Sequence, residues 1–212
     1  MFRQEATWLA AHLACLDDAA LGVVANIGSS TAAFRTREQP WIDEILFAPL
    51  ARRGVTIVHV DLKPAQGVDL CVDLLSDAGL AAIRALHPRT ILLCNLLEHV
   101  ENPARFAQRA WDALAPGGRL FVTVPCSYPH HNDPIDTMYR PAPKDVAALI
   151  PDAEMEAGEI LPCGSHGRDV WRDPRKISVK RLRWLFRPYR VTCVVLRKPD
   201  FPTPGIGLNP PA

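Results

Sequence analysis

Four short apolar segments, each ending in polar or glycine residues, constrain the fold of this chain more than any other feature. They are residues 23–30 (VVANIGSS), 55–64 (VTIVHVDLKP), 91–100 (ILLCNLLEHV) and 114–125 (LAPGGRLFVTVP). Strands that are buried on both faces are apolar along their length, and open parallel sheets bind ligands at the carboxyl ends of their strands. The order of these segments therefore predicts an α/β sheet with a nucleoside-type cofactor site at one edge.

Further strands and helices follow from the spacing of apolar residues and from turn residues. Predicted strands cover residues 22–27, 55–60, 68–72, 90–94, 119–124, 154–161 and 191–196. Predicted helices cover residues 6–16, a segment that starts near residue 32, residues 41–50 with an end at residue 54, and residues 80–86, 103–114, 144–150 and 179–186. Alternating strands and helices predict an α/β fold, a Rossmann-like, doubly wound, mostly parallel seven-stranded sheet with helices on both faces.

Length and composition favour one cytoplasmic domain. A chain of 212 residues with 48% hydrophobic content suits a single domain over residues 1–198, and the Pro- and Gly-rich residues 199–212 are expected to form a tail. The net charge of +1 removes the global electrostatic argument for nucleic-acid binding. The six cysteines form no C-x-x-C pair and are expected to be buried thiols in a reducing compartment. No segment approaches the roughly 18 uninterrupted apolar residues of a membrane span.

Two segments, NLLEHVENP (95–103) and LAPGGRLFVTVP (114–125), resemble class I S-adenosylmethionine-dependent methyltransferases. The resemblance is to the small-molecule type in which a segment such as LLEHV follows the fourth strand. It extends in order over about residues 22–125 and includes Asp61 at the end of the second strand. It implies S-adenosylmethionine as cofactor and transfer of its methyl group to oxygen or nitrogen of a small, sugar-like or anionic metabolite.

The loop after the first strand departs from the family pattern. The family carries an acidic residue and a run of glycines, which here correspond to Asn26, Gly28, Ser30 and Ala32, so only Gly28 is retained. A serine narrows the approach of the cofactor's methionyl part to the backbone, while its hydroxyl adds a hydrogen-bond donor. A dinucleotide site would need G-x-G-x-x-G, and two of those three glycines are missing. The loop therefore favours a methyltransferase over a dinucleotide-binding protein.

The resemblance places cofactor-binding residues at four strand ends. Asp61 would accept hydrogen bonds from both ribose hydroxyls, and Asp73 would meet the adenine amino group. The alternative for Asp61 is an ordinary turn residue, and for Asp73 a helix cap. The full cofactor-binding set is Asn26, Gly28, Ser29, Ser30, Asp61, Leu62, Asp73, Leu74 and Asn95.

Residues 126–146 (CSYPHHNDPIDTMYRPAPKDV) follow the fifth strand and are expected to cover the methyl group. Methyl transfer needs orientation, exclusion of water and, for a hydroxyl acceptor, a general base. His130 and His131 are the candidate catalytic bases because imidazole titrates near neutral pH. A metal site formed by His130, His131 and Asp133 is the disfavoured alternative, and no metal is expected.

Candidate substrate-binding residues are His99, Asp136, Tyr139 and Arg140. The residues after His131 would either orient the base or clamp an anionic group of the substrate. A structural histidine is an equally good interpretation of His99, and Asp136 and Arg140, four residues apart, are also spaced to pair with each other.

Two other functions remain open. The loss of loop glycines leaves a non-catalytic binding or assembly module with the same fold. The basic residues near the C-terminus leave an RNA methyltransferase, with the set Arg168, Arg172, Arg175, Lys176, Lys180, Arg181, Arg183, Arg187 and Arg190. However, residues 95–98 are NLLE, which lacks the N-P-P-aromatic signature of nucleobase amine methyltransferases. We therefore rank a small-molecule substrate above nucleic acid.

Overall fold

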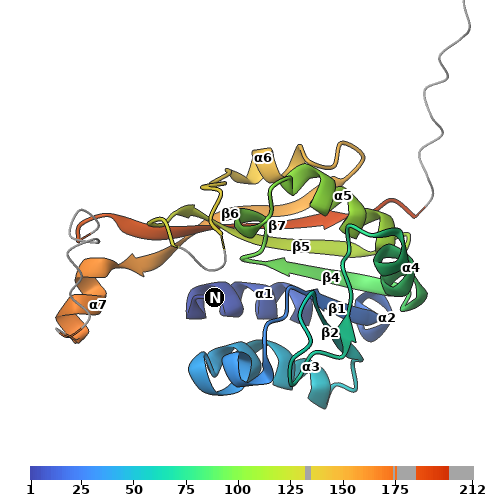
Figure 1. Ribbon diagram of the computed structural model, residues 1–212, viewed down its shortest axis with the longest axis horizontal. Coiled ribbons are helices and arrows are strands. Elements are labelled where there is room, and N and C mark those ends of the chain that lie inside the picture. Colours follow the sequence, from blue (N-terminus) through green and yellow to red (C-terminus); the bar gives the residue numbers. More distant parts are fainter. Residues whose placement is uncertain (132–134, 174, 176–184, 201–212) are drawn as a thin grey trace, which may run out of the picture.

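The computed structural model describes residues 1–131, 135–173, 175 and 185–200, and its centre is a sheet of seven strands (Figure 1). The strand order is β3-β2-β1-β4-β5-β7-β6. The strands are β1 (Val23–Ile27), β2 (Ile57–Asp61), β3 (Leu70–Cys71), β4 (Pro88–Cys94), β5 (Arg119–Ser127), β6 (Glu154–Ser165) and β7 (Pro188–Arg197). The pairs among β1 to β5 are parallel, whereas β7 is antiparallel to both β5 and β6. This confirms the doubly wound, mostly parallel sheet that the sequence predicts.

Helices cover both faces of the sheet (Figure 1). One layer contains α1 (Arg3–Ala14), α2 (Asp18–Leu21) and α3 (Ala48–Arg52), and the other contains α4 (Asp77–Ala85), α5 (Pro103–Ala113) and α6 (Pro143–Ala147). Shorter turns of other types are η1 (Phe34–Glu38), η2 (Asp43–Phe47) and η3 (Leu97–His99). The helix α7 (His166–Arg172) follows β6 at the end of the β6–β7 pair that projects from the sheet.

Several predicted elements differ from the observed ones. The helix predicted over residues 41–50 is divided into the π-helical η2 and the α-helical α3. Pro49 lies at the start of α3, where its missing N–H and its ring disfavour a regular helix through the preceding turn. The predicted third strand is only two residues long. The predicted helix over residues 179–186 lies almost wholly outside the described residues, as do residues 201–212 of the predicted tail.

The hydrophobic core forms two clusters, one on each face of the sheet. Ile91 and Leu93 of β4 pack into the cluster that includes residues of α4 and α5, whereas Leu92 between them packs into the cluster that includes α1. Side chains alternate between the faces of a strand, so a strand covered on both sides is apolar at nearly every position. This is the physical reason that the strands were visible as continuous apolar runs.

The cysteines match the expectation only in part. All six are free thiols, and Cys163 and Cys193 are buried, but Cys15 and Cys71 are exposed. The prediction of buried thiols was wrong for these two because Cys15 follows the end of α1 and Cys71 lies on the short edge strand β3. None of the helices among the described residues is long and apolar enough to span a membrane.

A polar pair joins β1 to β2 within this otherwise apolar region. Asn26 and His59 are register partners, and the Asn26 amide lies 3.1 Å from Nδ1 of the His59 ring. Burial, together with the positive charge of Arg35, lowers the pKa of His59 to about 4. The His59 ring is therefore neutral in the folded protein at pH 7, where Nδ1 can accept a hydrogen bond from the amide.

Protonation of His59 should make the fold less stable as the pH falls. The pKa is about 4 in the folded protein and near 6.5 in the unfolded chain, so the unfolded state binds the extra proton between these values. The ring's stabilising contribution is complete above pH ~6.5 and is lost as the pH falls toward ~4, by about 2 kcal/mol once solvent screening is allowed for. Urea unfolding of the wild type and of His59→Gln at several pH values measures this difference. Parallel pH profiles for the two proteins would contradict the assignment.

Candidate active site

The carboxyl ends of the parallel strands bring the predicted residues to one edge of the sheet. Gly28 follows β1, Asp61 ends β2, Asn95 follows β4 and His131 follows β5. The loops make direct contact, since a Cβ on Gly28 would lie 2.9 Å from the side chain of Leu96. The edge therefore brings the loop after β1 against the loop after β4.

The loop after β1 has the backbone of a glycine loop despite its serines. Gly28 has φ +75°, and Ser30, which stands where the family has a glycine, has φ +56°. This left-handed conformation is uncommon for residues other than glycine. The N–H groups of Gly28 and Ser29 both donate to the carbonyl of Val60, at 2.9 and 3.1 Å. The sequence change at position 30 has therefore kept the backbone conformation that a glycine would favour.

The side chain of Arg35 binds the carbonyl groups of the loop after β1. Its guanidinium is buried and donates to the carbonyls of Ser29 and Ser30, both at 2.8 Å, and to the carbonyl of Gly67 at 2.7 Å. Planar guanidinium donors in a fixed fork can join several acceptors at once. Sequence reasoning missed Arg35, because nothing in its neighbourhood distinguishes it from the exposed arginine that follows at position 37.

Asp61 forms the second part of the edge. Its Oδ2 accepts the N–H of Ser30 at 2.8 Å, and its Oδ1 accepts the N–H of Lys63 at 3.2 Å. Each carboxylate oxygen has a second lone pair, so both retain the capacity to accept a hydroxyl hydrogen bond. The adjacent side chain of Leu62 is 64% exposed. Asp61 therefore both fixes the loop and lies next to an open apolar surface.

The residues after β3 occupy different positions from those expected. The Asp73 carboxylate accepts the N–H of Leu75 at 2.9 Å, while the N-cap of α4 is Ser76, so the helix-cap interpretation of Asp73 was wrong. Leu74 is buried in the hydrophobic core. Asn26, the last predicted cofactor residue of β1, is buried against His59. Of the three predicted cofactor residues Asn26, Asp73 and Leu74, Asp73 is the one exposed to solvent.

Asn95 is held by a buried carboxylate of α1. Oε1 of Glu5 accepts hydrogen bonds from the Asn95 amide at 2.7 Å and from the Thr123 hydroxyl at 2.5 Å, while its Oε2 accepts the N–H of Phe2 at 3.1 Å. Glu5 is fully buried. It was not predicted as a site residue, although a charged residue three positions before the apolar Trp8 on a packed helix face was a usable signal.

Replacing Glu5 should loosen the site edge. In Glu5→Ala the buried Thr123 hydroxyl and the Asn95 amide lose their acceptor, so the free energy of unfolding should fall by about 1–3 kcal/mol. Chemical denaturation measures the change. Glu44→Ala, at an exposed glutamate of η2, is the matched control and should leave stability almost unchanged. Equal stabilities for the two variants would show that the Glu5 contacts contribute nothing.

A second group of side chains lies after β5. Nδ1 of His131 lies 3.0 Å from Oδ2 of Asp136, and Arg140 binds both oxygens of that carboxylate, at 3.0 and 2.6 Å. The Asp136 side chain is fully buried. Although burial opposes it, hydrogen bonds from Arg140, Met138 and His131 hold the pKa of Asp136 well below its usual range. Asp136 is therefore an anion that holds His131 in place.

Glu98 and His99 meet His131 at this point. His99 Nδ1 is hydrogen-bonded to the carbonyl of Ile135, and its Nε2 lies 3.8 Å from Oε1 of Glu98. The rings of His99 and His131 are perpendicular, with centroids 5.1 Å apart. Burial, reinforced by the charge of Glu5, raises the pKa of Glu98 to about 8. One possible ligand atom from each of Glu98, His99 and His131 lies within 4.8 Å of the others.

Other predicted site residues lie apart from this cluster. His130 is exposed, which leaves His131 as the candidate base with a fixed orientation. The hydroxyl of Tyr139 is buried without a hydrogen-bond partner among the described residues, and its ring packs against the core. Asp133 lies outside the described residues, as do Lys176, Lys180, Arg181 and Arg183 of the basic segment. The guanidinium of Arg140 is bound to both carboxylate oxygens of Asp136.

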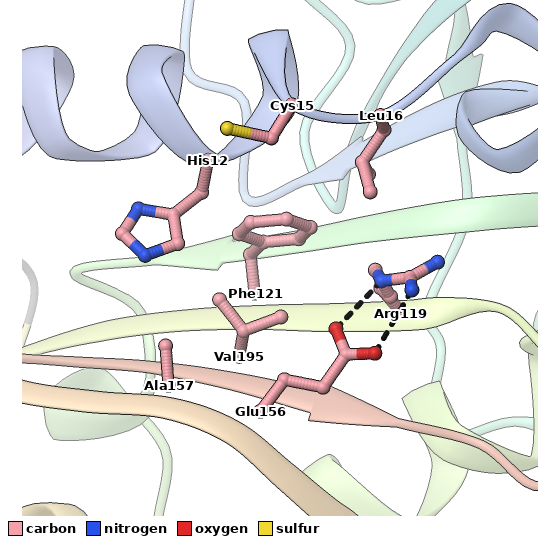
Figure 2. Close-up of a pocket in the computed structure, with 8 residues that line it drawn as sticks. All are labelled: His12, Cys15, Leu16, Arg119, Phe121, Glu156, Ala157 and Val195. Carbon is pink, nitrogen blue, oxygen red and sulfur yellow. Dashed lines mark hydrogen bonds and ion pairs between the residues drawn. The ribbon is translucent and has the colours of Figure 1, made fainter.

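A separate small pocket lies on the α1 face of the sheet (Figure 2). It is lined by His12, Cys15, Leu16, Arg119, Phe121, Glu156, Ala157 and Val195. Arg119 and Glu156 form a bidentate ion pair at its rim, at 2.7 and 2.8 Å. Since Arg119 begins β5, this pocket lies toward the amino end of the strand and away from the edge that carries Asp61.

Comparison with known proteins identifies the class. Residues 37–157 match the family model described as a methyltransferase domain, which is more than half of the chain. The chain belongs to this family and is a class I, S-adenosylmethionine-dependent methyltransferase, as the sequence predicted. No curated protein matches the sequence.

Solved structures share the fold at low identity. One is the Burkholderia thailandensis 1,6-didemethyltoxoflavin-N1-methyltransferase with bound 1,6-didemethyltoxoflavin and S-adenosylhomocysteine, at 16% identity and a TM-score of 0.53, covering 93% of this chain and 78% of that one. Another is the [4+2]-cyclase SpnF, at 15% identity and a TM-score of 0.55, covering 93% of this chain and 83% of that one. At these identities the likeness shows the fold alone.

Proposed function

We propose that the protein transfers the methyl group of S-adenosylmethionine to an oxygen or nitrogen atom of a small, sugar-like or anionic metabolite. The observation that carries the proposal is the edge formed by Gly28, Ser30 and Asp61, which keeps a glycine-loop backbone beside a carboxylate. The six free cysteines fit a reducing compartment and support a cytoplasmic location.

The residues of this edge fit the parts of the cofactor. The remaining lone pairs of the Asp61 carboxylate can accept hydrogen bonds from the two ribose hydroxyls. The exposed side chain of Leu62 offers an apolar surface to adenine. The left-handed turn from Gly28 to Ser30 allows the methionyl part to approach the backbone, with no side chain at position 28. Because Leu74 is packed in the core, Leu62 is the better candidate for the adenine contact.

The chemistry requires little of the protein beyond positioning and proton removal. The sulfonium of the bound cofactor supplies an activated methyl group. The protein must align the acceptor in line with the carbon–sulfur bond, exclude water and receive a proton from a hydroxyl acceptor. His131 suits the last role because Asp136 fixes its ring and burial lowers its pKa, so that the ring is neutral at pH 7.

The family match, and not the likeness of fold, supports methyl transfer, because SpnF has a similar fold and is a cyclase. The backbone conformation of Ser30 argues against a non-catalytic module. A left-handed φ at a residue other than glycine is strained, and such strain is usually kept at functional sites. Nothing in the described part of the basic segment favours RNA over a small metabolite.

Asp61→Ala should weaken cofactor binding by about 1–3 kcal/mol, the usual scale for losing hydrogen bonds to a charged group. Isothermal titration calorimetry with S-adenosylmethionine measures this change, and thermal unfolding checks that the variant remains folded. Asp152→Ala, at an exposed aspartate in a turn after α6, is the matched control. A dissociation constant equal to that of the wild type would remove Asp61 from the cofactor site.

His131→Ala should lower kcat about 100-fold or more while leaving the cofactor dissociation constant almost unchanged, because the ring serves the acceptor and not the cofactor. A screen of small metabolites by mass shift identifies a substrate on which kcat is then measured. Asp136→Asn should lower kcat less than His131→Ala does, since it removes only the charge that orients the His131 ring. Wild-type turnover in His131→Ala would exclude the proton-transfer role.

A further inference from the structure

We propose that Glu98, His99 and His131 bind one divalent metal ion of the zinc class beside the methyl-transfer site. Among the described residues, these three form the group whose possible ligand atoms all lie within 4.8 Å of one another. The catalytic role of the ion rests on the proposed function above, whereas its binding does not. This set shares only His131 with the metal alternative weighed from the sequence, because His99 and Glu98 are more than thirty residues away from His131 along the chain.

The ligand types suit such an ion. Two imidazole nitrogens and one carboxylate oxygen are the three protein ligands found in one class of catalytic zinc site, where the fourth position is left for water or substrate. Imidazole ligands select zinc, cobalt, nickel or iron over magnesium and calcium, which prefer oxygen ligands. The group therefore favours a transition-metal ion with an open position.

Both histidines have the outer contacts that metal-binding histidines use. In such sites the ring nitrogen that does not bind the metal is held by a carboxylate or a backbone carbonyl. His99 Nδ1 bonds to the carbonyl of Ile135, which leaves Nε2 on the side of Glu98. Nδ1 of His131 lies 3.0 Å from Oδ2 of Asp136, which also accepts the backbone N–H of His131 at 3.2 Å, and Arg140 holds Asp136 through two hydrogen bonds. These contacts orient both rings before any ion arrives.

Glu98 supplies an independent reason for a cation. Its side chain is 1% exposed, and its Oε2 has no hydrogen-bond partner among the described residues. A buried polar atom without a partner costs free energy, and a buried carboxylate usually has a paired charge or a metal. A divalent ion between Glu98 and the two imidazoles would provide that partner.

The open position would receive the oxygen of a hydroxyl acceptor, which makes a hydroxyl the acceptor class that we infer. With the ion bound, His131 would serve as a ligand in place of its role as the base. Binding to the ion would lower the pKa of the hydroxyl, whose proton would be released to solvent. The oxygen then attacks the methyl carbon of the sulfonium, so that a carbon–oxygen bond forms as the carbon–sulfur bond breaks. The sulfur keeps the bonding electron pair and leaves as the neutral thioether.

Metal binding is tested first without cofactor or substrate. The full chain is freed of metal with a chelator and titrated with CoCl2, followed by visible absorption, and with ZnCl2, followed by calorimetry. We expect one ion per chain and a cobalt spectrum typical of mixed nitrogen and oxygen ligands. Glu98→Gln, His99→Ala and His131→Ala should each weaken binding at least about tenfold, and Asp136→Asn about tenfold through the orientation of His131.

His87→Asn is the matched control, because His87 is exposed before the amino end of β4, at the opposite edge of the sheet from Glu98. It should bind cobalt as the wild type does. No cobalt binding by the wild type, or binding that none of the three ligand substitutions weakens, would overturn the proposal. Thermal unfolding identifies any variant that fails to fold, and His99→Gln then replaces His99→Ala.

The outcomes also separate the metal from the proposed function. Cobalt binding that the ligand variants weaken, in a protein that binds no S-adenosylmethionine, would support the metal site and refute the methyl transfer. Cofactor binding and turnover that persist after chelation, with no cobalt bound, would refute the metal and leave His131 as the base. Turnover that falls at least about tenfold on chelation and returns with zinc supports both.

Discussion

The shape of the active edge depends on the buried guanidinium of Arg35, which donates hydrogen bonds to the carbonyls of the irregular loop after β1. The turn after β1 places consecutive carbonyls in an environment where no strand can pair with them, and buried carbonyls need donors. Arg35 supplies donors to Ser29, Ser30 and Gly67 at once, so it joins the loop after β1 to the segment between β2 and β3. Asp61 completes this support from the end of β2 by accepting the N–H of Ser30. The cofactor edge is thus held in shape by the protein's own contacts.

Buried carboxylates determine the charges around His131, at the part of the edge that follows β4 and β5. Glu5 is fully buried and contributes to the raised pKa of Glu98, after burial itself. Asp136 is buried as well, yet Arg140 and backbone donors keep it charged. Two buried carboxylates close to His131, Glu98 and Asp136, thus have opposite pKa shifts. Environments that separate the pKa values of neighbouring groups are typical of catalytic sites.

The fold was predictable from the sequence to a large extent. The strands buried on both faces are mostly apolar along their length, and this is why β1, β4 and β5 were placed within a few residues. The helices before β2 were less visible, because Pro49 divides a pattern that otherwise has helical spacing. Cys71 is exposed because it lies on the edge strand β3. Its exposure could not be predicted, because the local sequence does not determine the order of the strands in the sheet.

The sequence by itself determined the class of sheet, the family and the position of Asp61, because apolar runs and short motifs are local properties of the chain. The tertiary structure alone decided which side chains meet there. It paired Glu5 with Asn95 and Thr123, turned Leu74 into the core, and placed His131 beside Glu98 and His99 while leaving His130 exposed. The physical reason is that the carboxyl ends of parallel strands bring together residues that are tens of positions apart in the sequence. No local sequence pattern shows which of these side chains point toward one another.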